Sequence, residues 1–218
     1  MIIDSFTFIY NSTMDPVSLI FSIIILIMSV VLHELSHGYA AVALGDPTPR
    51  IQGRLTLNPL KHLDPVGSVI VPIITSFFGF TFGWAKPVQW NPYNLKNRRS
   101  GESLIAAAGP CCNLFIAVVF SLLIRLSELP NFVSISASFI QISSYVVLIN
   151  IVLALFNLVP LPPLDGSHIL FSLLPPKWSH VRMIIERYSI FFLLIALFVI
   201  WPRVSPLIYV LFHALTGV

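Results

Sequence analysis

The sequence predicts an all-α membrane protein whose chain crosses the bilayer several times. Composition and the length of its apolar runs both point to this class. Of the 218 residues, 56% are hydrophobic and 10% are charged, whereas soluble domains carry about 25% charged residues. At ~20 residues per span, the length allows one helical bundle of about five or six membrane segments and no appended soluble domain. We therefore expect residues 1–218 to form a single transmembrane domain.

Four apolar runs are long enough to cross a bilayer. They cover residues 17–44, 103–126, 135–159 and 189–215. The last run contains Pro202 and Pro206, so it is either one broken span or two shorter pieces. A further run over residues 66–83 is short and is interrupted by glycine and proline. It is either a short span or a re-entrant element.

Basic residues indicate which connections face the cytoplasm. Lysine and arginine gather in residues 45–65, 84–102 and 160–188, and the positive-inside rule places all three on the cytoplasmic side. The run 66–83 lies between two of them, so it crosses twice or not at all, and we favour a re-entrant element. The net charge of +3 is too small and dispersed to suggest nucleic acid as a partner.

Two stretches are not expected to be regular helix. Residues 50–57 alternate polar and apolar side chains, which predicts a short strand over 51–57. Residues 160–166 contain three prolines, which remove backbone donors and clash with a preceding helical turn. Irregular backbone at membrane depth is tolerated only where protein or a water-filled cavity surrounds it. The proline-rich stretch therefore indicates a functional site.

The stretch His33-Glu34-Leu35-Ser36-His37 lies near the end of the first apolar run. On a helix, residues four apart share one face, so the two imidazoles are spaced to bind one metal ion. Glu34 can act as base toward a water at that metal. The alternative is that both histidines only pack against polar partners. Ionisable groups are costly inside a membrane, which favours a functional role.

A catalytic zinc usually has three protein ligands and one open position. Asp165 is the acidic residue that lies in an unwound segment next to a span, so it is the candidate third ligand. Its alternative role is an N-cap for the following helix. His168, three residues later, either lies beside the metal or is structural. Two amides in apolar runs, Asn113 and Asn157, either bond between helices or stabilise substrate and oxyanion.

These motifs resemble those of the site-2 protease family of intramembrane zinc metalloproteases, strongest over residues 30–175. The blocks that carry the resemblance are His33–Ala41 with Leu44–Thr48, Gly53–Gly67, Ala108–Pro110 with Asn113, and Asn157–Gly166. The closest likeness is to the short bacterial branch without PDZ or CBS modules. A departure is Ser167-His168, where a second glycine is common after Asp-Gly.

The resemblance implies that one zinc ion is bound by His33, His37 and Asp165. It implies that Glu34 is the catalytic acid and base, and that Asn113 and Asn157 contact the substrate or transition state. The expected protein is a multi-pass transmembrane metalloprotease of the cell membrane, with its site near the cytoplasmic side.

The expected reaction is cleavage of a peptide bond within or next to a transmembrane segment. The partners are then a membrane protein or peptide substrate and the lipid bilayer, and the oligomeric state is open. The edge of the predicted strand 51–57 would receive an extended substrate. The alternative function is a zinc-binding membrane transporter or sensor without hydrolysis. Glu34 favours the protease, because a binding site alone does not need a non-ligating carboxylate.

Overall fold

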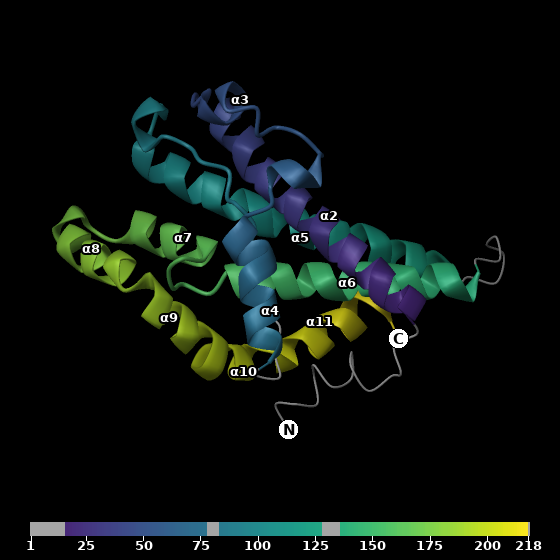
Figure 1. Cartoon of the computed structure of the whole chain (residues 1–218). Coiled ribbons are helices and arrows are strands. Elements are labelled where there is room, and N and C mark those ends of the chain that lie inside the picture. Colours follow the sequence, from purple (N-terminus) through teal and green to yellow (C-terminus); the bar gives the residue numbers. More distant parts are fainter. Residues whose placement is uncertain (1–15, 78–82, 128–135, 218) are drawn as a thin grey trace.

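The computed structural model describes residues 16–77, 83–127 and 136–217, and every regular element in these ranges is helical (Figure 1). Within them, three helices are long and apolar enough to cross a membrane: α2 (Pro16–Ala43), α5 (Arg98–Ser127) and α6 (Ala137–Asn157). A fourth span is formed if Ser179–Arg187 and Ser189–Val204, which meet at a bend of 77°, count as one. The all-α membrane class is confirmed, and the count of five or six segments stays a prediction.

The other elements are short. They are α3 (Thr48–Ile51), α4 (Val71–Ser76), α7 (Asp165–Leu173), α8 (Ser179–Arg187), α9 (Ser189–Ile195), α10 (Trp201–Val204) and α11 (Pro206–Thr216), with 3-10 turns at Pro59–Lys61, Pro92–Asn94 and Pro176–Trp178 and π-helical turns at Pro65–Ile70 and Ala196–Ile200. In Figure 1, α2, α5 and α6 lie at the centre, and α8 to α11 follow one another along one side.

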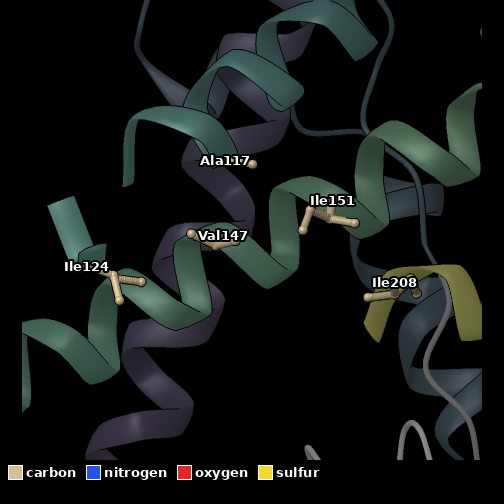
Figure 2. Packing of buried hydrophobic residues seen from close by; sticks show 5 residues of the cluster. All are labelled: Ala117, Ile124, Val147, Ile151 and Ile208. Atoms are coloured by element: carbon tan, nitrogen blue, oxygen red, sulfur yellow. The ribbon is translucent and has the colours of Figure 1, made fainter. Parts of the chain in front are cut away.

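Helix α5 packs against both α2 and α6 and forms the centre of the bundle. Figure 2 shows one apolar cluster, in which α5, α6 and α11 meet through Ala117, Ile124, Val147, Ile151 and Ile208. These small and β-branched side chains let the helices approach closely. These contacts hold α5, α6 and α11 together, and α2 packs against α5 and α6.

Large apolar side chains cover the outside of the bundle, and several polar side chains are buried inside it next to the apolar clusters. Ile20 of α2 is 57% exposed and Phe115 of α5 is 68% exposed, whereas Asn113 and Asn150 are 0% exposed. Water would disfavour so much exposed apolar surface, but a bilayer accommodates it. The protein is therefore a multi-pass membrane protein.

The segment that begins at Pro65 returns to its starting point. The N–H of Trp84 donates to the carbonyl of Gly67 at 3.0 Å, and the N–H of Lys86 donates to the carbonyl of His62 at 2.7 Å. The two helical pieces of this segment hold six residues each, so together they are about 18 Å long, less than the ~30 Å of a hydrocarbon core. Residues 78–82 of this run lie outside the described residues, so the re-entrant element stays a prediction.

The predicted strand over residues 51–57 is wrong. Helix α3 takes Thr48–Ile51, and the N–H groups of residues 52–54 donate to carbonyl oxygens of residues 48–50 at 3.0 Å. Pro49 in the first helical turn favours helix, because its missing N–H would be unpaired there anyway. A strand needs a neighbouring strand to pair its backbone, and these backbone bonds are local. The segment therefore presents no strand edge to a substrate.

The prediction of an irregular proline-rich stretch is confirmed. Helix α6 ends at Asn157 and α7 begins at Asp165. Asp165 is the first residue of α7, and Leu164 holds the N-cap position. The alternative role of Asp165 as an N-cap is therefore wrong.

Candidate metal centre

Two helices bring the predicted metal ligands together. His33 and His37 lie one turn apart on α2, and their Nε2 atoms are 3.0 Å apart. The Oδ2 atom of Asp165 lies 3.1 Å from His33 Nε2 and 3.3 Å from His37 Nε2. Both imidazoles are buried, and the side chain of Asp165 is 19% exposed. The three predicted ligands thus form one group that can hold a metal ion.

The dimensions of this group fit zinc. Ligand atoms at 2.0–2.1 Å from a tetrahedral zinc lie about 3.3–3.4 Å from one another, close to the observed separations. The Nδ1 atom of His37 lies 2.6 Å from the carbonyl oxygen of Ile105. Because a carbonyl only accepts, this nitrogen carries the hydrogen and a neutral ring keeps its lone pair on Nε2. That lone pair faces a carboxylate oxygen, an arrangement that a cation between them satisfies.

The position of Asp165 depends on the close packing of α7 against the end of α6. A Cβ atom added at Gly166 would lie 2.3 Å from the carbonyl oxygen of Leu158 and 2.5 Å from that of Val159. These are backbone atoms that cannot move aside individually. The Asp-Gly pair therefore lets the carboxylate enter the bundle directly after the proline-rich turn.

Helix α5 packs directly against both histidines. A Cβ atom added at Gly109 would lie 2.5 Å from His37 Nε2 and 2.6 Å from His33 Nε2. Gly109 thus leaves the space that the ligand atoms occupy. The hydrogen bonds from Nδ1 of both rings also end on α5, at Ile105 and at Asn113, so this helix orients both ligands.

Glu34 lies on α2 between the two ligands and is half-buried. Its Oε2 atom accepts a hydrogen bond of 2.8 Å from the backbone N–H of Val88. Val88 is buried in an extended segment that precedes α5. This contact orients the carboxylate and engages one of its two oxygens.

A buried carboxylate holds that extended segment against the end of α2. Asp46 is fully buried and accepts hydrogen bonds from the N–H of Asn91 at 2.6 Å, the amide of Asn94 at 2.8 Å and the N–H of Thr48 at 3.0 Å. Burial raises the pKa of Asp46, but the hydrogen bonds from Asn94, Thr48 and Asn91 outweigh it and hold the pKa below 3.8. The charged form of Asp46 therefore stabilises the fold here.

The two predicted amides lie in different places. Asn113 Oδ1 lies 2.5 Å from His33 Nδ1, directly behind a ligand. Asn157 is half-buried, and its amide donates to the carbonyl of Leu153 one turn back at 2.9 Å. The roles of both in substrate handling stay predictions. His168 lies edge-on to Trp90, with ring centroids 6.1 Å apart.

Sequence reasoning missed three residues at this site. Ser29 and Asn150 are buried polar residues: Asn150 accepts a hydrogen bond from Asn113 and donates one to Ser29. Their signal in the sequence was a polar side chain inside an apolar run. The backbone of Val88 contacts Glu34, and a backbone contact leaves no signal in the side chains.

A zinc-sized ligand group with a non-ligating carboxylate between two of its members defines a membrane metallohydrolase. The sequence profile of peptidase family M50 matches residues 127–196, which include Asp165. The "Putative zinc metalloprotease YwhC" of Bacillus subtilis is 38% identical over 200 residues, covering 87% of this chain and 89% of YwhC. The chain belongs to this family, which is the site-2 protease family, and it is a zinc metalloprotease.

Two further relatives carry related names. The "Putative zinc metalloprotease Rip2" of Mycolicibacterium smegmatis is 29% identical over 199 residues, which cover 88% of this chain and 73% of Rip2. The zinc metalloprotease MJ0392 of Methanocaldococcus jannaschii is 29% identical over 159 residues, which cover 73% of this chain and 36% of that protein. No solved structure matches the chain. These names favour the protease over the expected alternative of a transporter or sensor.

Proposed function

We propose that this zinc metalloprotease cleaves a peptide bond within or next to a transmembrane segment of a membrane protein. The observation that carries the proposal is the place of the ligands: His33 and His37 belong to α2, a helix long and apolar enough to span a bilayer. A site in a span is reached most directly by a substrate that also lies in the membrane.

The residues of the site divide the chemistry between them. His33, His37 and Asp165 would hold zinc, which polarises a scissile carbonyl and makes water acidic near neutral pH. Glu34 takes the proton from the attacking water and later delivers it to the leaving nitrogen. Its Oε1 atom does this, because Oε2 already accepts from Val88. The Val88 contact keeps the carboxylate aimed during both transfers.

Water and substrate need a path into the bundle. Asp165 keeps 19% of its side chain exposed, and it follows the proline-rich turn, where the backbone is irregular. Basic residues flank this end of α2 in the connections 45–65 and 84–97. We therefore place the entry on the cytoplasmic side of the cell membrane. A helical substrate must unwind there before its carbonyl can be attacked.

The experiment compares wild type with Glu34→Gln by quantitative proteomics of the native membrane. We expect the variant to keep zinc, since Glu34 is not a ligand, and to lose a set of cleaved fragments. Glu186→Gln makes the same change at an exposed carboxylate of α8 and should behave as wild type. Fragments that end within or beside transmembrane segments support the proposal. Fragments that end only in soluble domains contradict it, although they would still come from a protease.

A further inference from the structure

A chain of four buried polar side chains runs across the bundle and ends at a metal ligand. It links Ser29 and His33 of α2, Asn113 of α5 and Asn150 of α6. Asn113 and Asn150 are 0% exposed, and Ser29 and His33 are 5% exposed. Because burying an unpaired amide is costly, each hydrogen bond in the chain constrains the next.

The direction of every bond in the chain follows from one backbone carbonyl. The Nδ2 atom of Asn150 lies 2.8 Å from the carbonyl oxygen of Val146, which can only accept. This fixes the amide group of Asn150 toward Val146, and toward Ser29 Oγ at 3.0 Å. The Oδ1 atom of Asn150 must then face Asn113, whose Nδ2 donates to it at 2.7 Å.

The same logic extends to the metal ligand. With its Nδ2 turned to Asn150, Asn113 presents Oδ1 to His33 Nδ1 at 2.5 Å. A carbonyl oxygen only accepts, so Nδ1 of His33 carries the hydrogen. The lone pair of the neutral ring is then on Nε2, the atom that faces Asp165 and His37.

We propose that Asn150 is a positioning residue that sets the tautomer and orientation of His33 through Asn113. It touches neither the metal ligands' coordinating atoms nor Glu34, and it acts by preventing Asn113 from rotating its amide by half a turn. A rotated Asn113 would present an N–H to His33 Nδ1. That would favour the hydrogen on Nε2, where it blocks metal binding. The proposal rests on the zinc site and does not depend on which substrate is cleaved.

The test measures zinc affinity of the full-length protein in detergent by competition with a chelator. We expect Asn150→Leu to weaken zinc binding by about 10–100-fold, as loss of an outer-shell partner typically does. The matched control is Ser143→Ala, which changes another fully buried polar side chain of α6, one whose hydroxyl makes no hydrogen bond in the described part of the chain. That variant should bind zinc as wild type does. Visible absorption of the cobalt-substituted protein reports the same ligand geometry without requiring activity.

A double-mutant cycle separates this role from simple packing. If Asn150 acts through Asn113, Asn150→Leu should have no additional effect on zinc affinity in an Asn113→Leu background. Wild-type zinc affinity in folded Asn150→Leu overturns the proposal, as does full additivity in the double variant. If Asn150→Leu does not fold, Asn150→Ala removes the amide without adding bulk, and the same two criteria apply to it.

Discussion

Replacing Gly109 by alanine adds one methyl group at the point where α5 passes the metal ligands. The new Cβ atom would lie 2.5 Å from His37 Nε2 and 2.6 Å from both Cε1 and Nε2 of His33. Ordinary contact begins at 3.4 Å, so the imidazoles would have to retreat by about 0.8–0.9 Å. Metal–ligand distances tolerate about 0.2 Å. The displacement therefore exceeds the tolerance about fourfold, and we expect zinc affinity to fall by at least about 100-fold.

The substitution should not weaken the helix. Alanine is favoured over glycine in a helix interior by about 0.5–1 kcal/mol, so a loss of zinc cannot come from fraying of α5. Gly101→Ala is the matched control on the same helix, because its methyl group meets the movable side chain of Leu95, with the nearest atom at 2.9 Å. We expect that variant to bind zinc normally.

The assay is zinc content after dialysis against a graded series of chelator concentrations, with the purified protein in detergent. Secondary structure is followed by circular dichroism to show that Gly109→Ala stays helical. Wild-type zinc affinity in a helical Gly109→Ala protein would refute the reasoning, because it would mean that α5 and the ligands do not approach as closely as described.

Three further predictions concern the site and its support. Val88→Pro removes the N–H that donates to Glu34, a hydrogen bond to a charged group worth about 1.5–3 kcal/mol. We expect kcat to fall by about 10–100-fold with KM little changed. An unchanged kcat would argue against an orienting role for this contact. Asp165→Ala should lower the zinc affinity more than loss of any residue that only contacts a ligand. Chelator-treated wild type should regain activity when zinc is added. If Asp165→Ala keeps full zinc occupancy under chelation, Asp165 is not a ligand. The pKa of Asp46 is lower in the folded protein than its usual value of 3.8. Its negative charge therefore stabilises the fold fully above pH 3.8. This stabilisation is lost as the pH falls through the lower pKa of the folded state. Asp46→Asn should therefore lower the melting temperature at pH 7 and make a smaller difference at pH 3, and equal differences at both would contradict the account.

The sequence was sufficient to predict the class, the family and the three candidate metal ligands that the structure brings together. Helical periodicity alone places His33 and His37 on one face, because they are one turn apart. Three prolines forbid a regular helix whatever surrounds them, so the break before Asp165 is also local information. The apolar composition selects a membrane bundle because it leaves too little polar surface for water.

Contacts between distant segments needed the tertiary structure. The alternation over residues 50–57 resembled a strand, but pairing with a partner strand decides whether one forms, and none is present in the described part of the chain. The contact of Val88 with Glu34 joins residues 54 positions apart through a backbone N–H, which no side-chain pattern encodes. The approach of Gly109 to the ligands depends on the crossing of α5 and α2.

Asn113 shows most clearly what the sequence determines and what the tertiary structure determines. The sequence by itself marked it as a buried amide that must find a partner, and it left open whether that partner is another helix or the substrate. Only the tertiary structure decided which partners these are: His33 on one side and Asn150 on the other. The reason is physical, since an amide can donate and accept in several directions and the packing of α2, α5 and α6 leaves one of them.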